Sequence, residues 1–459
     1  MDAKHYFVEF SYLFASVFFI IGLKSLSHPD TARRGMHLAE IGMLLAIVGT
    51  LLHKDILSYG WIMVGLVIGG GIGGAIAHFC PMTALPQQTA LSHAFGAFAA
   101  ALVGIAEYSR LHGSISTSTM IALGIEVILG ALTTTGSLVA AAKLQDLLPG
   151  APMTFKGQNA VNMAMLAVSI GAFVWLLVSP GAAFAFYVML TLAFVFGLML
   201  VMPIAAADMP VVMSLLNSYA GLAAAATGFA ISNNVLIIAG TLNGFSGFIL
   251  SVQMCRAMNR SITNVMFGAF GSVSEAAASG PAGEAREINI EDVATQLAYA
   301  RQVIFVPGYG MATAQAQHVV RELGDVLEER GVTVKYAIHP VAGRMPGHMN
   351  VLLAEADVPY SQLFELEQIN SDFPNTDVAV VIGANDVVNP DARDNPKSPI
   401  AGMPILDVDR ARSVVVLKRG KGRGFAGIEN PLFFKPNTGM LYGDAKSTLS
   451  KLVQAVEQA

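Results

Sequence analysis

Apolar segments of about 20 residues recur through the first half of this chain, and they constrain its fold more than any other feature. A helix needs about 20 mostly apolar residues to cross ~30 Å of hydrocarbon. Only 13% of the 459 residues are charged, whereas soluble domains carry about 25%. We therefore predict that residues 1–256 form a polytopic helical membrane bundle with about nine spans. The predicted spans are residues 6–24, 36–53, 60–79, 86–108, 116–141, 159–178, 182–203, 209–231 and 234–255.

The lysines and arginines between these spans predict how the bundle is oriented. Cytoplasmic loops of membrane proteins carry an excess of Lys and Arg. With an odd number of spans, a cytoplasmic C-terminus leaves only Lys4, Lys54 and Arg110 outside. The cations gathered inside are Lys24, Arg33, Arg34, Lys143, Lys156, Arg256 and Arg260. We therefore predict an external N-terminus, whose first span is retained, and a cytoplasmic C-terminal domain.

Charge and cysteine content exclude several other classes of protein. The net charge of -5 gives no basic signal for a nucleic-acid partner. The two cysteines, Cys80 and Cys255, belong to no CxxC motif or Cys/His cluster. Neither a metal site nor a disulfide framework is therefore indicated.

A few polar side chains interrupt the apolar spans. Ionisable groups at membrane depth cost at least ~2.5 kcal/mol and usually face a bundle interior or a wet cavity. Because the proton of histidine comes and goes near neutral pH, we interpret His93 as a proton relay. Asn217 and Ser137 either extend a hydrated path or join helices by hydrogen bonds, and the second interpretation is favoured for each residue taken alone.

Two carboxylates are also associated with the spans. Glu126 either pairs with a neighbouring helix or lies nearer the interface than the span limits suggest. Asp208 stands at the predicted cytoplasmic start of a span, before Met209 and Pro210. An acid at a helix N-terminus is stabilised by the helix dipole, and this accounts for Asp208 on the sequence alone.

The sequence pattern changes after Arg256. Residues 257–290 lose the apolar continuity and are typical of a flexible linker. In residues 291–459, short apolar runs alternate with helical patterns, which predicts a doubly wound parallel sheet of the Rossmann-like α/β class. The predicted strands are 303–306, 332–338, 378–382 and 414–417, and the predicted helices include 311–330 and 444–457.

A glycine-rich loop joins the first predicted strand to the first predicted helix. It consists of Gly308, Tyr309, Gly310, Met311 and Ala312. In this context glycines permit a tight turn and let the backbone approach a pyrophosphate, while the helix N-terminus favours negative charge. Thr313 stands at the third glycine position, so the dinucleotide fingerprint is incomplete.

The choice of nucleotide is predicted from two other strand ends. An NAD site normally has Asp or Glu after the second strand, and Ala337-Ile-His-Pro340 has neither. The missing acid leaves NADP(H) as a possible ligand. A site for NADP(H) needs cations to bind the 2′-phosphate. The loop after residue 417 supplies Lys418, Arg419, Lys421 and Arg423. Arginine grips phosphate through a bidentate fork and lysine acts as a point charge; the alternative is a solvated basic loop.

Two further loops belong to the same candidate site. Arg344 is positioned in the sequence to make another phosphate contact. Gly383, Ala384, Asn385 and Asp386 leave a strand end. Asn385 and Asp386 either form the turn there or face the ligand, and the residues alone do not decide between these roles.

Longer characteristic stretches of sequence surround these motifs. In the C-terminal half they are residues 308–312, 315–317, 339–350, 382–386, 396–404, 418–419 and 427–433, and in the membrane half 208–210 and 216–219. In these stretches the chain closely resembles the β subunits of proton-translocating NAD(P) transhydrogenases. The resemblance covers essentially the whole chain.

The resemblance implies an NADP(H)-binding domain on a nine-span bundle. Lys418 and Arg419 would hold the 2′-phosphate, and Arg344 would contact the dinucleotide, which this family binds in reversed orientation. Asp386 would lie beside the cofactor as part of the proton-coupling machinery. The other implied cofactor contacts are Gly308, Tyr309, Gly310, Met311, Ala312, Gly383, Ala384, Asn385, Gly424 and Phe425. Family members often have Tyr where this chain has Phe425, which puts a hydrogen bond there in doubt.

The resemblance also implies a proton path and partners. His93, Ser137 and Asn217 would belong to the path, and Asp208 would lie at its cytoplasmic mouth. The partner would be an α subunit that carries the NAD(H) domain and further spans. We also expect a homodimer of the αβ unit and a multi-pass location in a bacterial inner membrane.

Two functions are consistent with these features. The first is hydride transfer from NADH on the partner to NADP+ on this chain, coupled to inward proton movement. The alternative is a channel or transporter gated by a nucleotide-sensing domain. The cationic loop, together with the missing acid after the second strand, favours the first function.

Overall fold

The structure is a computed structural model in which the chain divides into two compact units. One unit comprises Met1–Leu148, Met153–Pro203 and Met213–Leu250, and the other comprises Pro149–Pro152, Ile204–Val212 and Ser251–Ala459. The structure describes residues 3–53, 56, 58–111, 114–145, 147–149, 152–205, 208–258, 262, 265, 285–345, 347–396, 398, 400–420, 422, 424 and 426–459.

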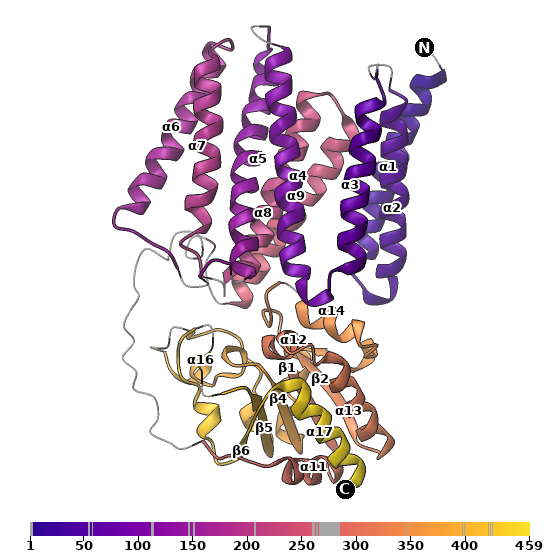
Figure 1. The fold of residues 1–459 in the computed structure, drawn as a ribbon, viewed down its shortest axis with the longest axis vertical. Helices are drawn as coiled ribbons and strands as arrows, with labels where there is room; N and C mark the ends of the chain where they lie inside the picture. The colour runs from indigo at the N-terminus through magenta and orange to yellow at the C-terminus, as the bar shows by residue number, and fades with distance from the viewer. Residues whose placement is uncertain are drawn as a thin grey trace. The chain divides into compact units, whose positions relative to one another are not determined.

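Nine helices among the described residues are long and apolar enough to span a membrane. They confirm the predicted multi-pass bundle (Figure 1). The helices are α1 (Ala3–Ser25), α2 (Pro29–Leu51), α3 (Gly60–Phe79), α4 (Leu85–Arg110), α5 (Thr117–Leu144), α6 (Gln158–Val178), α7 (Ala183–Val201), α8 (Met209–Ala230) and α9 (Asn234–Ala257).

Small residues let α4 and α5 pack closely. A Cβ atom added at Gly130 would lie 2.9 Å from the carbonyl oxygen of Ala97 and 3.1 Å from the backbone nitrogen of Ala101. One added at Gly104 would lie 2.6 Å from Cγ2 of Val127. These contacts define an antiparallel register for the two helices. In lipid such close packing, rather than hydrophobicity, holds helices together.

The second unit is built on a six-stranded sheet in the order β3-β2-β1-β4-β5-β6, with every neighbouring pair parallel. This order confirms the predicted doubly wound, Rossmann-like class. The strands are β1 (Gln302–Pro307), β2 (Thr333–Ile338), β3 (Leu363–Glu365), β4 (Val378–Ile382), β5 (Ser413–Lys418) and β6 (Thr438–Tyr442). Because β1 and β4 are neighbours, the chain leaves the middle of the sheet in both directions, and ligands of such sheets bind at this switch point.

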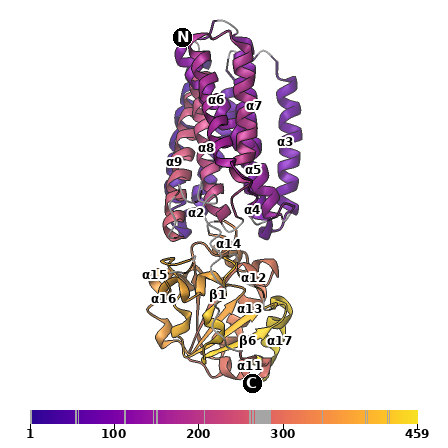
Figure 2. The ribbon, with the colours of Figure 1, turned by 90° about the vertical axis from the view of Figure 1, so that its left-hand side faces the viewer.

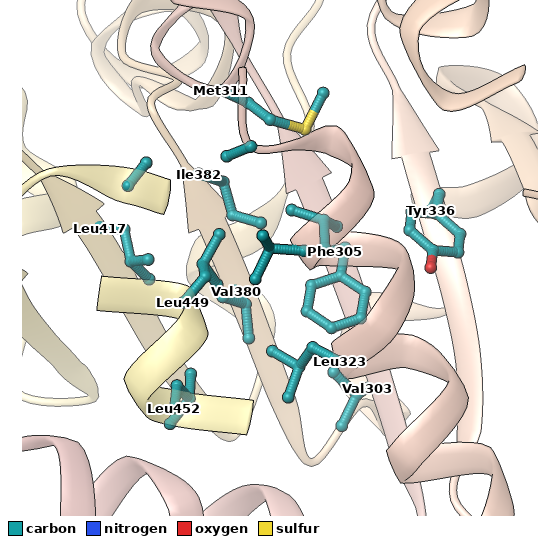
Figure 3. Packing of buried hydrophobic residues seen from close by; sticks show 14 of the residues in the cluster. Val303, Phe305, Met311, Leu323, Tyr336, Val380, Ile382, Leu417, Leu449 and Leu452 are labelled. Atoms are coloured by element: carbon teal, nitrogen blue, oxygen red, sulfur yellow. The ribbon is translucent and has the colours of Figure 1, made fainter. Parts of the chain in front are cut away.

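Helices cover both faces of this sheet (Figure 2). They are α11 (Ile290–Ala298), α12 (Tyr309–Thr313), α13 (Gln317–Glu329), α14 (His348–Glu355), α15 (Leu366–Ile369), α16 (Asp391–Asp394) and α17 (Ala445–Gln458). Side chains alternate between the two faces along each strand. Phe305 and Val380 pack on the face that holds α13 and α17, as Figure 3 shows, whereas Ile304 and Val381 join the opposite core.

The structure corrects one predicted helix. We expected a single helix over residues 311–330, and this was wrong, because α12 ends at Thr313 and α13 begins at Gln317. Gln315, between them, adopts a left-handed conformation with φ of 49°, which a continuous helix does not tolerate. Most of the predicted glycine-rich loop therefore belongs to a five-residue helix, which Gly308 precedes.

The ends of the second unit are tied to the sheet. Asp444 accepts a hydrogen bond from the backbone N–H of Ser447 at 3.2 Å and caps α17, close to where the sequence predicts that this helix begins. Before α11, the N–H of Ile288 donates to the carbonyl of Met440 on β6 at 3.1 Å. Residues 266–284 of the predicted linker lie outside the described residues, so the predicted boundaries at residues 256 and 290 stay predictions.

Candidate functional site

The glycine-rich loop after β1 packs backbone to backbone on the turn after β4. A Cβ added at Gly308 would lie 2.5 Å from Cα of Ala384, and one at Gly310 would lie 2.6 Å from Cα of Gly383. The N–H of Gly308 donates to the carbonyl of Ile382, and that of Gly310 to the carbonyl of Gly383, both at 2.9 Å. The glycines are therefore needed for this close approach, and their two amides are engaged within the protein.

The two cations after β5 have different environments. Lys418 is half-buried; its ammonium donates to the carbonyl of Gly422 and lies 4.6 Å from the ring centroid of Phe433. Burial lowers the pKa of Lys418, and the charge of Asp386 opposes this shift. Arg419 is exposed and donates from Nη2 to the hydroxyl of Thr313 at 3.1 Å. The structure thus brings Arg419 to the end of α12. Lys421, Arg423 and Phe425 lie outside the described residues.

Asn385 and Asp386 form part of a loop cluster beyond β4. Oδ2 of Asp386 accepts a hydrogen bond from the N–H of Ala426 at 3.0 Å. A Cβ added at Gly424 would clash with Asp386 and would lie 2.9 Å from Nδ2 of Asn385. Asn430, which the sequence did not single out, is buried and donates to the carbonyl of Asn385 at 3.0 Å. The loop after β5 is therefore fastened to the turn after β4.

Arg344 approaches the same loop from the segment after β2. Its guanidinium carbon lies 4.4 Å from the ring centroid of Tyr309. The backbone N–H of Arg344 donates to Nδ1 of the buried His348 at 3.1 Å. This bond places the proton of a neutral His348 on Nε2. Burial, reinforced by the charge of Arg344, lowers the pKa of His348 to about 4.

His339 occupies the position after β2 at which an NAD site would offer an acid. The side chain is buried; Nδ1 accepts from the N–H of Val341 at 3.2 Å, and Nε2 lies 2.8 Å from the carbonyl oxygen of Pro404. Neutral imidazole protonated at Nε2 satisfies both contacts. Burial lowers the pKa of His339 to about 4, although the bond to Pro404 opposes the shift. His339 therefore fixes the loop, a role that the sequence did not reveal.

In the membrane bundle, the predicted path residues occur at one level. The antiparallel register of α4 and α5 places His93 level with Ser137. A Cβ added at Gly136 would lie 3.2 Å from Cδ2 of Leu216 on α8, so Asn217 lies at the same level. Nδ1 of His93 and Oγ of Ser137 are buried and make no hydrogen bond with any described residue. Asn217 accepts a bond from Asn243 of α9 at 3.1 Å, as interhelical joining predicts.

Asp208 is buried directly before the first residue of α8. This position agrees with the interpretation of an acid at a helix N-terminus. Asn243 is a polar partner that the sequence did not single out. A polar residue on a neighbouring span was the available signal, because such residues in lipid seek each other.

Comparison with known proteins decides the family. The family profile described as NAD(P) transhydrogenase beta subunit matches residues 8–455. The chain belongs to the NAD(P) transhydrogenase beta subunit family. It is 48% identical over 456 residues to the NAD(P) transhydrogenase subunit beta of Rhodospirillum rubrum, covering 97% of this chain and 98% of the relative. The protein of that name from a defined strain of the same species gives the same figures.

Membership of the transhydrogenase family agrees with the architecture of the chain. The family implies an NADP(H) site, an α subunit as partner and a membrane location. The described helices provide the multi-pass membrane part, and the parallel sheet provides a nucleotide-binding fold. The resemblance stated from the sequence is thereby confirmed.

Proposed function

We propose that this chain is the NADP(H)-binding and proton-translocating subunit of a transhydrogenase complex. Hydride passes from NADH on the partner α subunit to NADP+ on this chain, while protons move inward. The C-terminal domain then lies on the cytoplasmic side of a bacterial inner membrane. The observation that carries the proposal is the convergence of Arg419 with the loop after β1, at the switch point of the sheet.

The residues present fit a phosphorylated dinucleotide. Gly308 and Gly310 let the backbone of the first loop lie directly against the turn after β4, which brings two strand ends together at the switch point of the sheet. Because their amides already donate to the carbonyls of Ile382 and Gly383, negative charge is left to the cations. Arg419 and Lys418 would hold the 2′-phosphate, and Arg344, stacked on Tyr309, would contact the dinucleotide.

The remaining predicted contacts complete this proposed site. They are Met311, Ala312, Gly383, Ala384, Asn385, Asp386, Gly424 and Phe425. The cofactor supplies the hydride acceptor, so the chain need only bind and orient it. Asp386, held by the N–H of Ala426 and within the field of Lys418, would sense the nucleotide and pass its state to the coupling machinery.

Proton movement would be coupled to this site through conformation. His93, Ser137 and Asn217 would belong to the proton path at one level of the bundle, and Asp208 would lie at its cytoplasmic mouth. Protonation can drive the reaction only if the two states of the protein differ in affinity for the nucleotide. We infer that the complex contains two αβ units.

The test is a purified αβ complex in sealed vesicles, given NADH and an NADP analogue. We expect reduction of the analogue together with acidification of the compartment that corresponds to the cytoplasm. The alternative, a channel gated by a nucleotide sensor, predicts ion flux without hydride exchange. Absence of hydride exchange in an intact complex that still binds NADPH would exclude the proposed function.

A further inference from the structure

Glu126 lies in the interior of the membrane bundle, well away from the level of His93. Its side chain is fully buried on α5. A Cβ added at Gly104 of α4 would lie 3.4 Å from Cδ of Glu126, and Thr227 of α8 donates to its Oε1 at 2.8 Å. Three helices therefore enclose the carboxyl group. An ionisable group in such a place is costly and is a functional residue by default.

Thr227 can satisfy both protonation states of Glu126. Its Oγ1 lies 2.8 Å from Oε1 of Glu126 and 3.0 Å from the carbonyl oxygen of Ala223. A hydroxyl has one proton to donate and can accept as well. When Glu126 is ionised, the hydroxyl donates to the carboxylate. When Glu126 is protonated, the acid donates to Thr227, whose proton turns to Ala223, and no heavy atom needs to move.

A row of buried polar atoms connects Glu126 with the level of His93. Oε2 of Glu126 and the hydroxyls of Thr133 and Ser137 are buried, and none makes a hydrogen bond with a described residue. On α5 these residues follow at spacings of seven and four, which places them on one helix face. Glu126 and Ser137 are about 16 Å apart along the helix axis. Buried polar atoms of this kind are normally satisfied by internal water.

The charges around Glu126 are few. Glu107 of α4 acts on it as a like charge, but that carboxylate is hydrogen-bonded to Arg110 at 2.7 Å. Helices α7 and α8 contain no charged residue. Among the described residues near Glu126, the other charged side chains are therefore Glu107 and Arg110, which pair with each other. Glu126 lies near the opposite end of α8 from Asp208.

We propose that Glu126 is a further proton-carrying residue, which exchanges protons between the side of the membrane remote from Asp208 and the level of His93. A proton from the medium converts its carboxylate to the carboxylic acid, and release along the row of Thr133 and Ser137 restores the carboxylate. Thr227 is a positioning residue that stabilises either state. The proposal rests on the proton translocation described above.

The test compares four variants of the αβ complex in sealed vesicles. Glu126→Gln keeps the size and the hydrogen bond but cannot release a proton, and Glu126→Asp keeps the carboxylate. Thr227→Val removes the hydroxyl. The control is Glu329→Gln, because Glu329 is exposed on α13, outside the membrane-spanning helices. Proton uptake, hydride transfer and NADPH binding are measured on the same preparations.

We expect Glu126→Gln to lower proton uptake about tenfold or more, with NADPH affinity unchanged, and Glu126→Asp to recover part of the rate. Glu329→Gln should match the wild type. A Glu126→Gln complex that moves protons as fast as the wild type overturns this proposal alone. A wild-type complex that neither transfers hydride nor moves protons overturns the proposed function instead.

An infrared measurement keeps the proposal testable even if Glu126→Gln fails to fold. Acidification of the wild-type complex should produce a carboxylic-acid C=O band from Glu126. In Thr227→Val this band should move to higher frequency, because the acid loses its hydrogen-bond partner. A titrating band that is the same in both proteins would show that Glu126 does not exchange a proton beside Thr227.

Discussion

Arg419 is the exposed cation through which nucleotide selectivity can be tested most simply. Its guanidinium contacts Thr313 and is free to pair with a 2′-phosphate only in NADP(H). A hydrogen bond to a charged group contributes ~1.5–3 kcal/mol. We therefore expect Arg419→Ala to weaken NADPH binding about tenfold or more and to leave NADH binding nearly unchanged. Isothermal titration of the purified chain measures both.

A matched control for Arg419→Ala is available on α13. Arg330 follows this helix, is exposed, and donates to the carbonyl of Glu457 at 3.1 Å. Arg330→Ala removes the same charge from the same unit, so it should leave the affinity for NADPH unchanged. Equal losses of NADPH affinity in the two variants would show that Arg419 acts only through the net charge of this unit.

His339 and His348 predict a pH dependence of stability. Burial lowers both pKa values to about 4, against an ordinary value near 6.5. The unfolded chain therefore binds more protons between these values. The stabilisation is fully present above about pH 6.5 and is lost as the pH falls toward 4, by up to ~1.4 kcal/mol per pH unit for each histidine.

Urea unfolding of residues 285–459 at several pH values measures this effect. His339→Gln should lower stability at pH 7 and flatten the dependence below pH 6.5. The same substitution at His318, which is exposed on α13, should leave the dependence as it is in the wild type. If the free energy of unfolding depends on pH equally steeply in all three proteins, the pH dependence does not come from His339.

The contact between the loop after β1 and the turn after β4 makes a prediction about packing. Gly308→Ala would place Cβ 2.5 Å from backbone atoms of Ala384, which cannot turn aside as a side chain can. We expect a loss of ~1–3 kcal/mol in the free energy of unfolding. Gly422→Ala is the control for stability, because no atom of the described residues, apart from its own neighbours in the chain, lies within 4 Å of a Cβ there. Thermal unfolding measures both, and equal stability of the two variants would contradict the close approach.

An element can be predicted from the sequence when the residues within that element determine its structure. Long apolar segments can only be helices in lipid, so all nine spans were predicted, with differences mainly at the ends. The break at Gln315 was missed because it depends on one left-handed residue inside an amphipathic pattern. Strand β3 has three residues, which is too short for a pattern, and β6 was not predicted either.

The candidate site was predictable where a motif carries chemistry. The glycines and cations were found because phosphate binding needs them at strand ends. The contacts of His339 with Pro404 and of Asn430 with Asn385 join segments far apart in the chain. Such contacts leave no local sequence pattern, because the fold determines which distant residues are brought together. The sequence indicated that Glu126 is a buried acid. Its hydrogen bond with Thr227 could be found only from the way the helices pack in the structure.

Coupling across the molecule makes a prediction by linkage. If protonation of the bundle changes the affinity for NADP(H), binding of NADPH must change proton binding by the same free energy. We expect NADPH binding by the αβ complex to be accompanied by proton uptake or release, seen by calorimetry in buffers of different ionisation enthalpy. His93→Ala should remove this proton exchange.

His318 provides the control, because it is an exposed histidine on α13, outside the membrane-spanning helices. His318→Ala should keep the proton exchange of the wild type. Proton exchange that survives unchanged in His93→Ala would contradict the coupling role of that residue and favour a membrane part that merely anchors the nucleotide-binding domain.

The most direct test of the account is the choice between the two dinucleotides. The purified full-length chain is titrated with NADPH and, separately, with NADH under the same salt and pH. We expect NADPH to bind more tightly by about tenfold or more, because Lys418 and Arg419 meet a phosphate that NADH lacks. Equal or tighter binding of NADH would contradict it.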